Sequence, residues 1–530
     1  MGTPPDSERD ERKLSRRDLL KTAAAGGGAL IAAPYVRPAR ALAARSGGIR
    51  GMNVLVFLTD QERAIQHFPA GWAAANLPGL TRLQQNGLTF TRAFTNSCMC
   101  SPARSTLLSG YFPAQHGVKY TLEEDMPDDQ YPQSELPLGL ANLASVAASA
   151  GYTPVYKGKW HVSKPAGSEF APGDVAAYGF GRWNPPDAGA NQDVSEAGGG
   201  TPNHDGRYMN SVGAAADGDE GILQYLGSQA AQDQPFFLVV SLVNPHDVLL
   251  YPKTYLSAGY DDSWLDGSVD LPETAGEDLS TKPTAQRLFL LLSQGLGVLS
   301  TPAMRRSYLN FYANLMRASD RYLVDVLDAL ESNGLLDSTL VVRTADHGEM
   351  GLAHGGLRQK NFNAYEESIR VPLVYSNPRL FKRPRTDDAL VSHVDFLPTV
   401  ASLLGAPRSA RSAWQGRDYS RHVLNRASGG LQPYVIFTYD DYQAGQPSGP
   451  YIPPTNHIVA IREPRWKLAR YYDANGVAAD QWEMYDLQAD PLETTNLAYP
   501  GYAMTSSQQK AFSRLQARLA QVEATRLQPL

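Results

Sequence analysis

A short segment that begins at Cys100 combines a nucleophile, a helix start and a cation. It reads Cys100-Ser101-Pro102-Ala103-Arg104. Proline suits the first turn of a helix, so we expect Cys100 just before a helix, at the positive end of its dipole. A bound anion or an anionic nucleophile is favoured at that point, and the side chain of Arg104 can reach back to it. The alternative is a buried structural cysteine near a helix cap.

Four apolar runs that predict buried strands all end in polar or titratable residues. The runs cover residues 53–58, 152–156, 236–243 and 339–342. In an open α/β sheet, sites form at the carboxyl ends of the strands, so side chains that follow the strands gather at one edge. The residues expected there are Asp60, Gln61, Lys159, His161, His246, Asp346 and His347. Four strands with this pattern predict one shared, charged site.

The elements that position these residues have the pattern of an α/β protein. Short apolar runs separated by helical patterns predict a large, mostly parallel sheet flanked by helices, with a further strand at 371–375. Apolar side chains at helical spacing over 305–336 predict a long helix that stops at Gly334. We expect this catalytic domain to cover residues 52–425.

The C-terminal region has a different pattern. Aromatic, strand-like runs at 434–439, 457–462 and 466–471 predict an antiparallel sheet, which a polar helix at 506–525 closes. We assign residues 431–530 to this smaller C-terminal subdomain. Two loops rich in glycine or proline, 188–205 and 440–455, are expected to lie over the site and to shape the substrate pocket.

Composition limits the class of protein. The 530 residues suffice for one large α/β domain with an accessory part, or for two or three smaller domains, and the hydrophobic fraction of 42% is that of a globular protein. The net charge of −6 gives no basic surface for nucleic acid or anionic lipid. The two cysteines, Cys98 and Cys100, make neither a disulfide framework nor a complete zinc site.

The first 43 residues predict an export signal rather than part of the fold. The paired Arg16 and Arg17 precede a short apolar run at 22–33, and small residues suited to cleavage follow. The run is too short for a stable membrane span. The segment resembles a bacterial twin-arginine signal. This resemblance implies that the twin-arginine translocase exports the folded protein to the periplasm or the exterior, after its cofactor chemistry is complete.

The segment from Cys100 onward resembles the signature of the sulfatase family. In that family the formylglycine-generating enzyme reads Cys-x-Pro-x-Arg in the unfolded chain and oxidises the cysteine to formylglycine. The core of this recognition site is intact, with Ala103 in place of the usual serine and Tyr111 in place of the usual arginine. The resemblance implies formylglycine at position 100 and the alkaline-phosphatase-like fold of sulfatases.

The resemblance also implies a divalent metal site. Its ligands are Asp60, Asp346, His347 and the modified Cys100, with Gln61 as a further ligand. Most of the family has a second aspartate where this chain has Gln61, although choline-sulfatase-like and phosphonate-hydrolase-like branches share the glutamine. Calcium is the metal that the family implies. A histidine ligand is uncommon for calcium, so manganese and magnesium stay open.

The roles of the remaining site residues follow from the same resemblance. Lys159, Lys360 and Arg104 surround the sulfate, His161 is the site histidine and His246 protonates the departing alcohol. One hydroxyl of the hydrated formylglycine attacks sulfur, and the second allows the sulfated intermediate to expel sulfate. The expected enzyme is therefore a sulfuric ester hydrolase that acts on small-molecule or carbohydrate sulfate esters.

Two other functions fit the sequence. Asp60-Gln61 and Asp346-His347 also suit a phosphodiester or phosphonate monoester hydrolase of the same superfamily, although the two lysines and the arginine favour sulfate. A non-catalytic binder of sulfated ligands would have lost the nucleophile or the metal ligands, and neither is missing. Aryl, choline and carbohydrate sulfates all stay open as substrates. The tyrosines of the 440–455 loop favour a flat or cationic leaving group.

Overall fold

A computed structural model describes residues 49–64, 67–123, 126–127, 129–189, 193–210, 220–411, 413–427, 429–446 and 449–530 of the protein. The export signal expected at residues 1–43 lies outside the described residues. Among the helices of these ranges, none has the length and apolarity needed to cross a bilayer.

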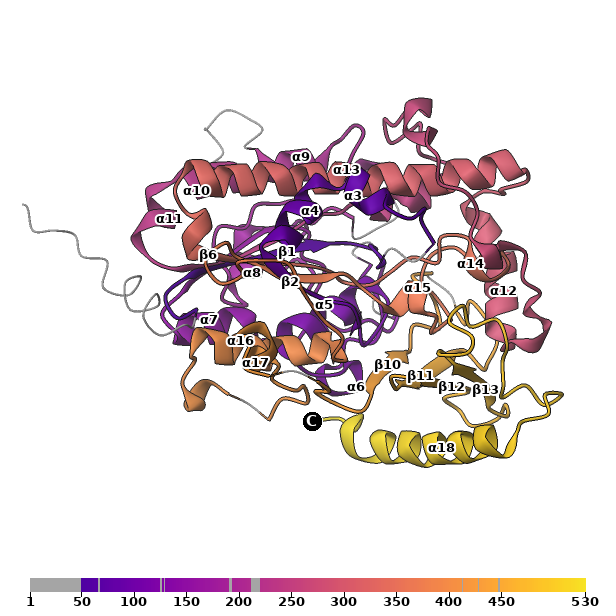
Figure 1. Ribbon diagram of the computed structural model, residues 1–530. Helices are drawn as coiled ribbons and strands as arrows, with labels where there is room; N and C mark the ends of the chain where they lie inside the picture. The colour runs from indigo at the N-terminus through magenta and orange to yellow at the C-terminus, as the bar shows by residue number, and fades with distance from the viewer. Residues whose placement is uncertain are drawn as a thin grey trace, which may run out of the picture.

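A seven-stranded sheet forms the centre of the molecule (Figure 1). In spatial order its strands are β4 (Thr153–Gly158), β5 (Phe236–Ser241), β1 (Asn53–Thr59), β6 (Thr339–Ala345), β7 (Leu373–Ser376), β2 (Gly87–Phe90) and β8 (Arg385–Asp387). The strands β4, β5, β1 and β6 are parallel neighbours. Strand β7 is antiparallel to both β6 and β2, and β8 is parallel to β2. The expected mostly parallel α/β sheet is therefore confirmed.

The parallel strands are buried on both faces, which explains why they appear in the sequence as continuous apolar runs. In β1, Val54, Val56 and Leu58 belong to one hydrophobic core, and Leu55 and Phe57 belong to the other. Successive side chains of a strand point to opposite faces, so a strand between two helical layers must be apolar at every position.

Helices cover both faces of the sheet (Figure 1). One layer contains α3 (Trp72–Asn76), α4 (Pro78–Gln85), α9 (His204–Met209), α10 (Ile222–Gly227) and α13 (Pro302–Ser332), and the other contains α5 (Cys100–Ser109), α7 (Leu143–Ser149) and α16 (Phe396–Leu404). The long helix α13 confirms the helix expected at 305–336. The Thr301 side chain caps its start, and Gly334 follows its end with a φ of +67°.

The C-terminal region forms a second sheet, as expected. It consists of four antiparallel strands, β10 (Val435–Tyr439), β11 (His457–Arg462), β12 (Trp466–Tyr472) and β13 (Gln481–Asp486). Helix α18 (Ser506–Arg526) packs its apolar side, including Leu515 and Leu519, onto this sheet. Strand β13 was not expected from the sequence, because its polar residues hide the alternation that marks a strand.

The strand expected at 371–375 is present as β7, but it does not run parallel to its neighbour. The chain leaves β6 at Ala345 and passes through α14 (Ala353–Gly356) and α15 (Glu366–Ile369). It then enters β7 antiparallel to β6. A parallel strand would need a crossover that carries the chain back to the opposite edge of the sheet. The short elements between β6 and β7 make no such crossover.

A buried ion network joins helix α15 to the C-terminal sheet. Glu366 of α15 accepts from Arg462 of β11 at 3.1 Å, and Lys467 of β12 lies 2.5 Å from Glu493 and 3.4 Å from Glu366. Burial favours the neutral form of Glu366, but Arg462 and Lys467 outweigh it and lower the pKa of this carboxyl to about 2. Burial raises the pKa of Glu493 to about 7, although Lys467 opposes the shift.

We predict that Lys467→Met destabilises the protein strongly. The change leaves Glu366 and Glu493 buried with one cation fewer, and such a loss typically costs about 3–5 kcal/mol. Urea unfolding measures the effect. The matched control is Arg465→Met, whose partner is Asp486 but whose side chain is 52% exposed; we expect a loss below about 1 kcal/mol there. A Lys467→Met protein as stable as the control would show that the network contributes little.

His354 belongs to a second buried charge cluster rather than to the cavity beside Cys100. Its Nδ1 lies 2.7 Å from Glu277, its Nε2 lies 3.7 Å from Glu367, and its ring stacks on Tyr365 at 3.6 Å. Burial alone would lower the pKa of His354, but Glu367 and Glu277 outweigh burial and raise it to about 9. The charged imidazole therefore stabilises the fold.

We predict that this stabilisation disappears in alkaline solution. The folded pKa of about 9 lies above the unfolded value of about 6.5, so the contribution is complete below about pH 6.5 and is lost as the pH rises through 9. The difference in unfolding free energy between wild type and His354→Gln should shrink by about 3 kcal/mol from pH 6 to pH 10. Burial lowers the pKa of His116 to about 3, so the gap for His116→Gln should not shrink. A constant gap for His354→Gln would contradict the prediction.

Candidate active site

Cys100 is the first residue of α5 and is buried at 2% exposure. It therefore lies inside the first turn of the helix rather than just before it, with Met99 as the N-cap residue. Its Sγ is 3.2 Å from Nε2 of His347 and 3.6 Å from Oδ1 of Asp60. Burial, reinforced by the Asp60 carboxylate, raises the pKa of the Cys100 thiol to about 12. An unmodified thiol at this position would therefore stay protonated near neutral pH.

The structure brings the expected metal ligands together. One donor atom each from Asp60, Cys100, Asp346 and His347 lies within 4.8 Å of every other, and all four residues are buried. Both carboxylates follow neighbouring strands, β1 and β6. Two acidic groups and an imidazole held this close without solvent form a donor set that suits a divalent cation.

Arg104 holds the two carboxylates in place. Its Nε donates to Asp346 at 2.9 Å and its Nη2 donates to Asp60 at 3.2 Å. Its Nη1 donates to the Ser241 hydroxyl at 2.8 Å and to the Lys159 carbonyl at 3.1 Å. Burial favours the neutral form of Asp60, but Lys159 and the other cationic groups around it hold the pKa of its carboxyl well below its usual range. Asp60 is therefore ionised at physiological pH.

The two lysines enter the site from different elements. Lys159 follows β4, and its Nζ lies 2.6 Å from Oδ2 of Asp60 and donates to the carbonyl of Gly189. Burial opposes its charge, but Asp60 outweighs burial and raises the pKa of Lys159 to about 12. Lys360 donates to Oε1 of Gln61 at 2.6 Å.

Gln61 is connected to the site through its side-chain amide. Its Oε1 accepts from Lys360, and its Nε2 donates to Glu349 at 2.5 Å and to Gln359 at 3.2 Å. The amide therefore positions Lys360 between the strand ends. A direct role of Gln61 as a metal ligand stays a prediction.

His161 and His246, two of the three histidines expected in the site, are neutral. Burial and the charge of Lys159 lower the pKa of both His161 and His246 well below the usual range. Nε2 of His161 lies 2.6 Å from the carbonyl of Leu122, which can only accept, so this nitrogen carries the proton. Nδ1 is then a free acceptor, buried and without a hydrogen bond to any described residue. Asp187 fixes the turn, because its carboxylate accepts from the backbone N–H of His161 at 2.7 Å.

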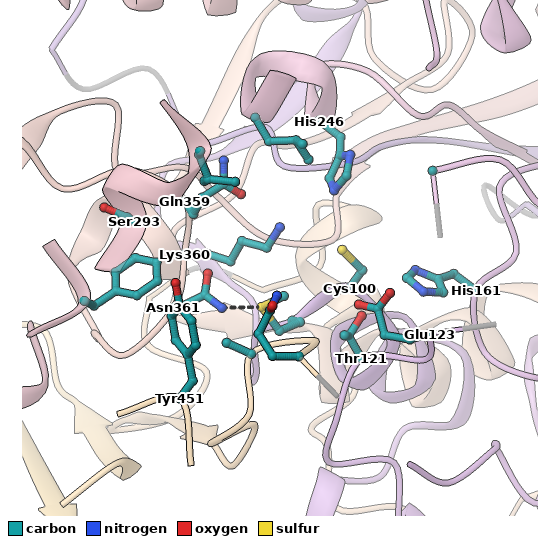
Figure 2. A pocket seen from close by; sticks show the side chains of 17 residues that line it. Cys100, Thr121, Glu123, His161, His246, Ser293, Gln359, Lys360, Asn361 and Tyr451 are labelled. Carbon is teal, nitrogen blue, oxygen red and sulfur yellow. Dashed lines mark hydrogen bonds between the residues drawn. The ribbon is translucent and has the colours of Figure 1, made fainter. Parts of the chain in front are cut away.

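A cavity opens above Cys100 (Figure 2). Four of the expected site residues line it: Cys100, His161, His246 and Lys360. Asp60 and His347 contact the Cys100 thiol. Arg104 binds Asp60 and Asp346, and Lys159 pairs with Asp60. Both loops expected over the site contribute to the walls, the first through Gly189 and the second through Ala444, Gln446 and Tyr451.

Sequence reasoning missed most of the walls of this cavity. Among the described residues they include Thr121, Glu123, Leu249, Phe289, Leu296, Gln359 and Asn361. These residues belong to loops and short helices, where no strand end or repeat marks a functional position. A signal was available for Gln359 and Asn361, because they flank the expected site residue Lys360.

Comparison with known proteins defines the class of this site. The sulfatase family model matches residues 52–406, and the model described as N-sulphoglucosamine sulphohydrolase, C-terminal, matches residues 354–525. The choline-sulfatase of Rhizobium meliloti (strain 1021) is 28% identical over 465 residues, which cover 84% of this chain and 82% of the relative.

Solved structures share the fold at low identity. A 2-O GAG sulfatase superposes with a TM-score of 0.67 and 21% identity, over 90% of this chain and 92% of the other. The phosphonate monoester hydrolase of Agrobacterium radiobacter superposes with a TM-score of 0.60 and 22% identity, over 88% of this chain and 95% of the other.

The fold matches that of a solved sulfatase, and beside Cys100 it brings together four buried donor atoms that could hold a metal ion. The chain belongs to the sulfatase family, because the sulfatase model covers more than half of it. It is a sulfuric ester hydrolase, which converts sulfate esters to an alcohol and inorganic sulfate. Family membership implies a metal ion and a formylglycine, and the buried donor group that includes Cys100 could hold the metal.

We predict that Arg104→Lys lowers both the activity and the stability of the protein, although the substitution keeps the positive charge. A lysine cannot reproduce the planar fork that binds Asp60, Asp346 and Ser241 at once. We expect kcat/KM to fall by at least about 100-fold, together with a loss of stability of about 2–4 kcal/mol. The matched control is Arg82→Lys, which alters an exposed ion pair with Asp328 and should leave both quantities unchanged. Full activity of Arg104→Lys would mean that the guanidinium geometry is dispensable.

Proposed function

We propose that the chain hydrolyses sulfate esters through a formylglycine formed from Cys100, with a divalent metal held by Asp60, Asp346 and His347. One observation carries this proposal: four buried donor atoms converge within 4.8 Å at the start of a helix. The Cβ of Cys100 is the carbon that would become the aldehyde. The hydrate of this aldehyde would supply a hydroxyl nucleophile and a second hydroxyl on the same carbon.

The metal would be held by the two aspartates and the histidine, together with the modified residue 100, and Gln61 is a proposed further ligand. When bound, it would lower the pKa of a hydroxyl on the hydrated aldehyde. Oxygen-rich ligation favours calcium or magnesium, whereas the nitrogen of His347 suits a transition metal such as manganese better. We propose calcium, since the aspartates dominate the donor set.

The cations of the site would bind the sulfate group. Lys360 lines the cavity, and Lys159 and Arg104 lie at its floor. Because these side chains are buried and held by hydrogen bonds, they need little reorganisation when charge develops on the sulfate oxygens. They would therefore stabilise the transition state more than they could in water.

His246 would transfer a proton, and His161 would accept a hydrogen bond. We propose that His246 protonates the departing alcohol, a step typically worth roughly 10²–10⁴-fold. The unprotonated Nδ1 of His161 is a hydrogen-bond acceptor that would orient a hydroxyl beside Cys100. A bound sulfate ester brings a negative charge that opposes the Lys159 charge, and so it would raise the pKa of His246 toward the range of a general acid.

The proposal also covers the substrate class, the enzyme that modifies Cys100 and the compartment to which the protein is exported. The substrates would be sulfate esters of small molecules or of carbohydrates, since the similar proteins include a choline-sulfatase and a 2-O GAG sulfatase. A formylglycine-generating enzyme would modify Cys100, and the paired Arg16 and Arg17 support export by the twin-arginine translocase to the periplasm or the exterior. Phosphonate monoester hydrolysis is the competing activity, because a hydrolase of that type shares the fold.

Mass spectrometry of the tryptic peptide that contains position 100 tests the nucleophile. In protein co-expressed with a formylglycine-generating enzyme, we expect a loss of about eighteen daltons relative to cysteine. Cys100→Ala should abolish hydrolysis of nitrophenyl sulfate, while Cys98→Ala should leave the modification in place, because Cys98 lacks the proline and arginine at the required spacing. An unmodified thiol in active protein would exclude the formylglycine mechanism. A higher kcat/KM for a phosphonate monoester than for any sulfate ester would favour the competing activity.

A further inference from the structure

Glu349 is a buried carboxylate that the proposed mechanism does not use. It lies in the segment that follows strand β6, and it is 0% exposed. Its Oε1 accepts from the hydroxyl of Tyr308 at 2.6 Å and from the backbone N–H groups of Gly351 at 3.1 Å and Gln359 at 3.0 Å. Its Oε2 accepts from Nε2 of Gln61 at 2.5 Å. Four donors therefore occupy the two oxygens of this carboxylate.

The backbone holds the carboxylate in one place. The N–H of Glu349 donates to the carbonyl of Glu367 at 3.1 Å, and the N–H of Gly348 donates to the carbonyl of Ser368 at 2.8 Å. Gly348 packs so closely on α15 that an added Cβ would lie 1.9 Å from the carbonyl oxygen of Glu367. The segment after β6 is therefore fixed on α15, and Glu349 cannot move without displacing that helix.

Helix α13 fixes both members of the pair that Glu349 and Gln61 form. Tyr308 donates to Glu349, and Tyr312, one turn later, donates to the backbone carbonyl of Gln61 at 2.8 Å. The N–H of Gln61 donates to Oδ1 of Asp346 at 3.0 Å. Gln61 has a φ of +65°, which residues other than glycine seldom adopt, so these bonds hold a conformation that the chain alone does not favour. The remaining choice is which end of the Gln61 amide faces Glu349.

The partners of the Gln61 amide allow one orientation. A carboxylate oxygen accepts hydrogen bonds, whereas a lysine ammonium donates them. The amide must therefore turn its NH₂ toward Glu349 and its oxygen toward Lys360, whose Nζ lies 2.6 Å from Oε1. Nε2 also donates to Oε1 of Gln359 at 3.2 Å. In the reverse orientation the NH₂ group would face the ammonium and the amide oxygen would face the carboxylate.

The position of Lys360 depends on this orientation. Lys360 is buried, lines the cavity and points toward Cys100 in Figure 2. Among the described residues, Gln61 is the one whose oxygen accepts from its Nζ. A buried ammonium that loses its acceptor has to find another, because an unpaired charge is costly inside the protein. Lys360 would then leave the position from which it faces a sulfate at Cys100.

We propose that Glu349 is a positioning residue, which orients the Gln61 amide and thereby holds Lys360 at the sulfate position. The inference rests on the proposed function, because it takes Lys360 to contact a sulfate at Cys100. Glu349 is not among the described residues that line the cavity, so its effect on the substrate passes through Gln61. A hydrogen bond to a charged group typically changes affinity by roughly ten- to a hundredfold.

Glu349→Gln tests the orientation, because it exchanges one acceptor for a donor. The new side chain keeps its oxygen toward the three donors at Oε1, so its NH₂ faces Gln61. The Gln61 amide then turns its oxygen to that group and its own NH₂ to Lys360. At saturating metal we expect kcat/KM for nitrophenyl sulfate to fall by about tenfold or more, and the inhibition constant of inorganic sulfate to rise by about threefold or more.

Adding Gln61→Glu to Glu349→Gln should restore the site. A carboxylate at position 61 accepts from the amide at position 349 and from Lys360 at once. The Gln359 amide, whose Nε2 is buried without a hydrogen bond to any described residue, can turn and donate as well. We expect the double variant to recover kcat/KM to within about threefold of wild type. Gln61→Glu alone sets two carboxylates against each other and should lower the melting temperature.

A Lys360→Met background shows whether the effect passes through Lys360. There Glu349→Gln should lower kcat/KM by less than about twofold further, since the side chain that it displaces is already gone. A loss caused by the changed charge alone, or by a weakened metal site, would persist in this background.

Glu483→Gln is the matched control. Glu483 is buried and likewise accepts from a glutamine amide and two tyrosine hydroxyls, those of Gln286 at 2.8 Å and of Tyr471 and Tyr485 at 2.7 Å each. It is absent from the described wall of the cavity. We expect this variant to have a lower melting temperature and to keep kcat/KM within about threefold of wild type.

Three results would overturn the proposal. Glu349→Gln could be as active as wild type, the double variant could be no more active than Glu349→Gln, or Glu349→Gln could reduce kcat/KM as strongly in the Lys360→Met background as in wild type. If Glu349→Gln does not fold, the double variant decides: activity close to wild type supports the inference, and an unfolded or inactive protein rejects it. Wild type that hydrolyses nitrophenyl sulfate without these effects rejects this inference alone. Wild type that carries formylglycine but hydrolyses no sulfate ester rejects the proposed function.

Discussion

The rest of the structure depends on the pairing of two buried carboxylates, Asp60 and Asp346, with buried cations. Neither carboxylate is exposed to solvent. An ion buried without a partner costs several kcal/mol, so each must meet an opposite charge inside the protein. Arg104 contacts both carboxylates and Lys159 contacts Asp60. The helix and the strands that carry these residues are therefore fixed relative to one another by electrostatics as well as by apolar packing.

The parallel sheet meets this requirement through its register. Thr59 at the end of β1 is level with Ala345 at the end of β6, so the residue that follows each strand is an aspartate at the same edge. Strand β4 reaches the same edge beyond β5, and Lys159 comes directly after its last residue. Side chains that are distant in sequence thus meet without long loops, and short, buried strand ends hold them more rigidly than loops would.

Much of this arrangement could be predicted from the sequence, because continuous apolar runs mark buried parallel strands and their carboxyl ends share an edge. The positions of Asp60, Lys159 and Asp346 follow from that rule alone. The direction of β7 could not be predicted, since it depends on where the chain turns after Ala345. The cavity wall around Glu123 was equally hidden, because loop conformation depends on contacts between distant segments and leaves no periodic pattern.

The charge balance of the cluster explains why anion binding and cation binding belong together at this site. Two carboxylates and two cations, Arg104 and Lys159, cancel each other, so the floor of the cavity by itself has little attraction for a sulfate. A divalent cation on the carboxylates would add two positive charges to this balanced group. The same floor would then attract an anion strongly. In the proposed function the aspartates would therefore hold a cation whose charge extends to the substrate, besides neutralising the arginine and the lysine.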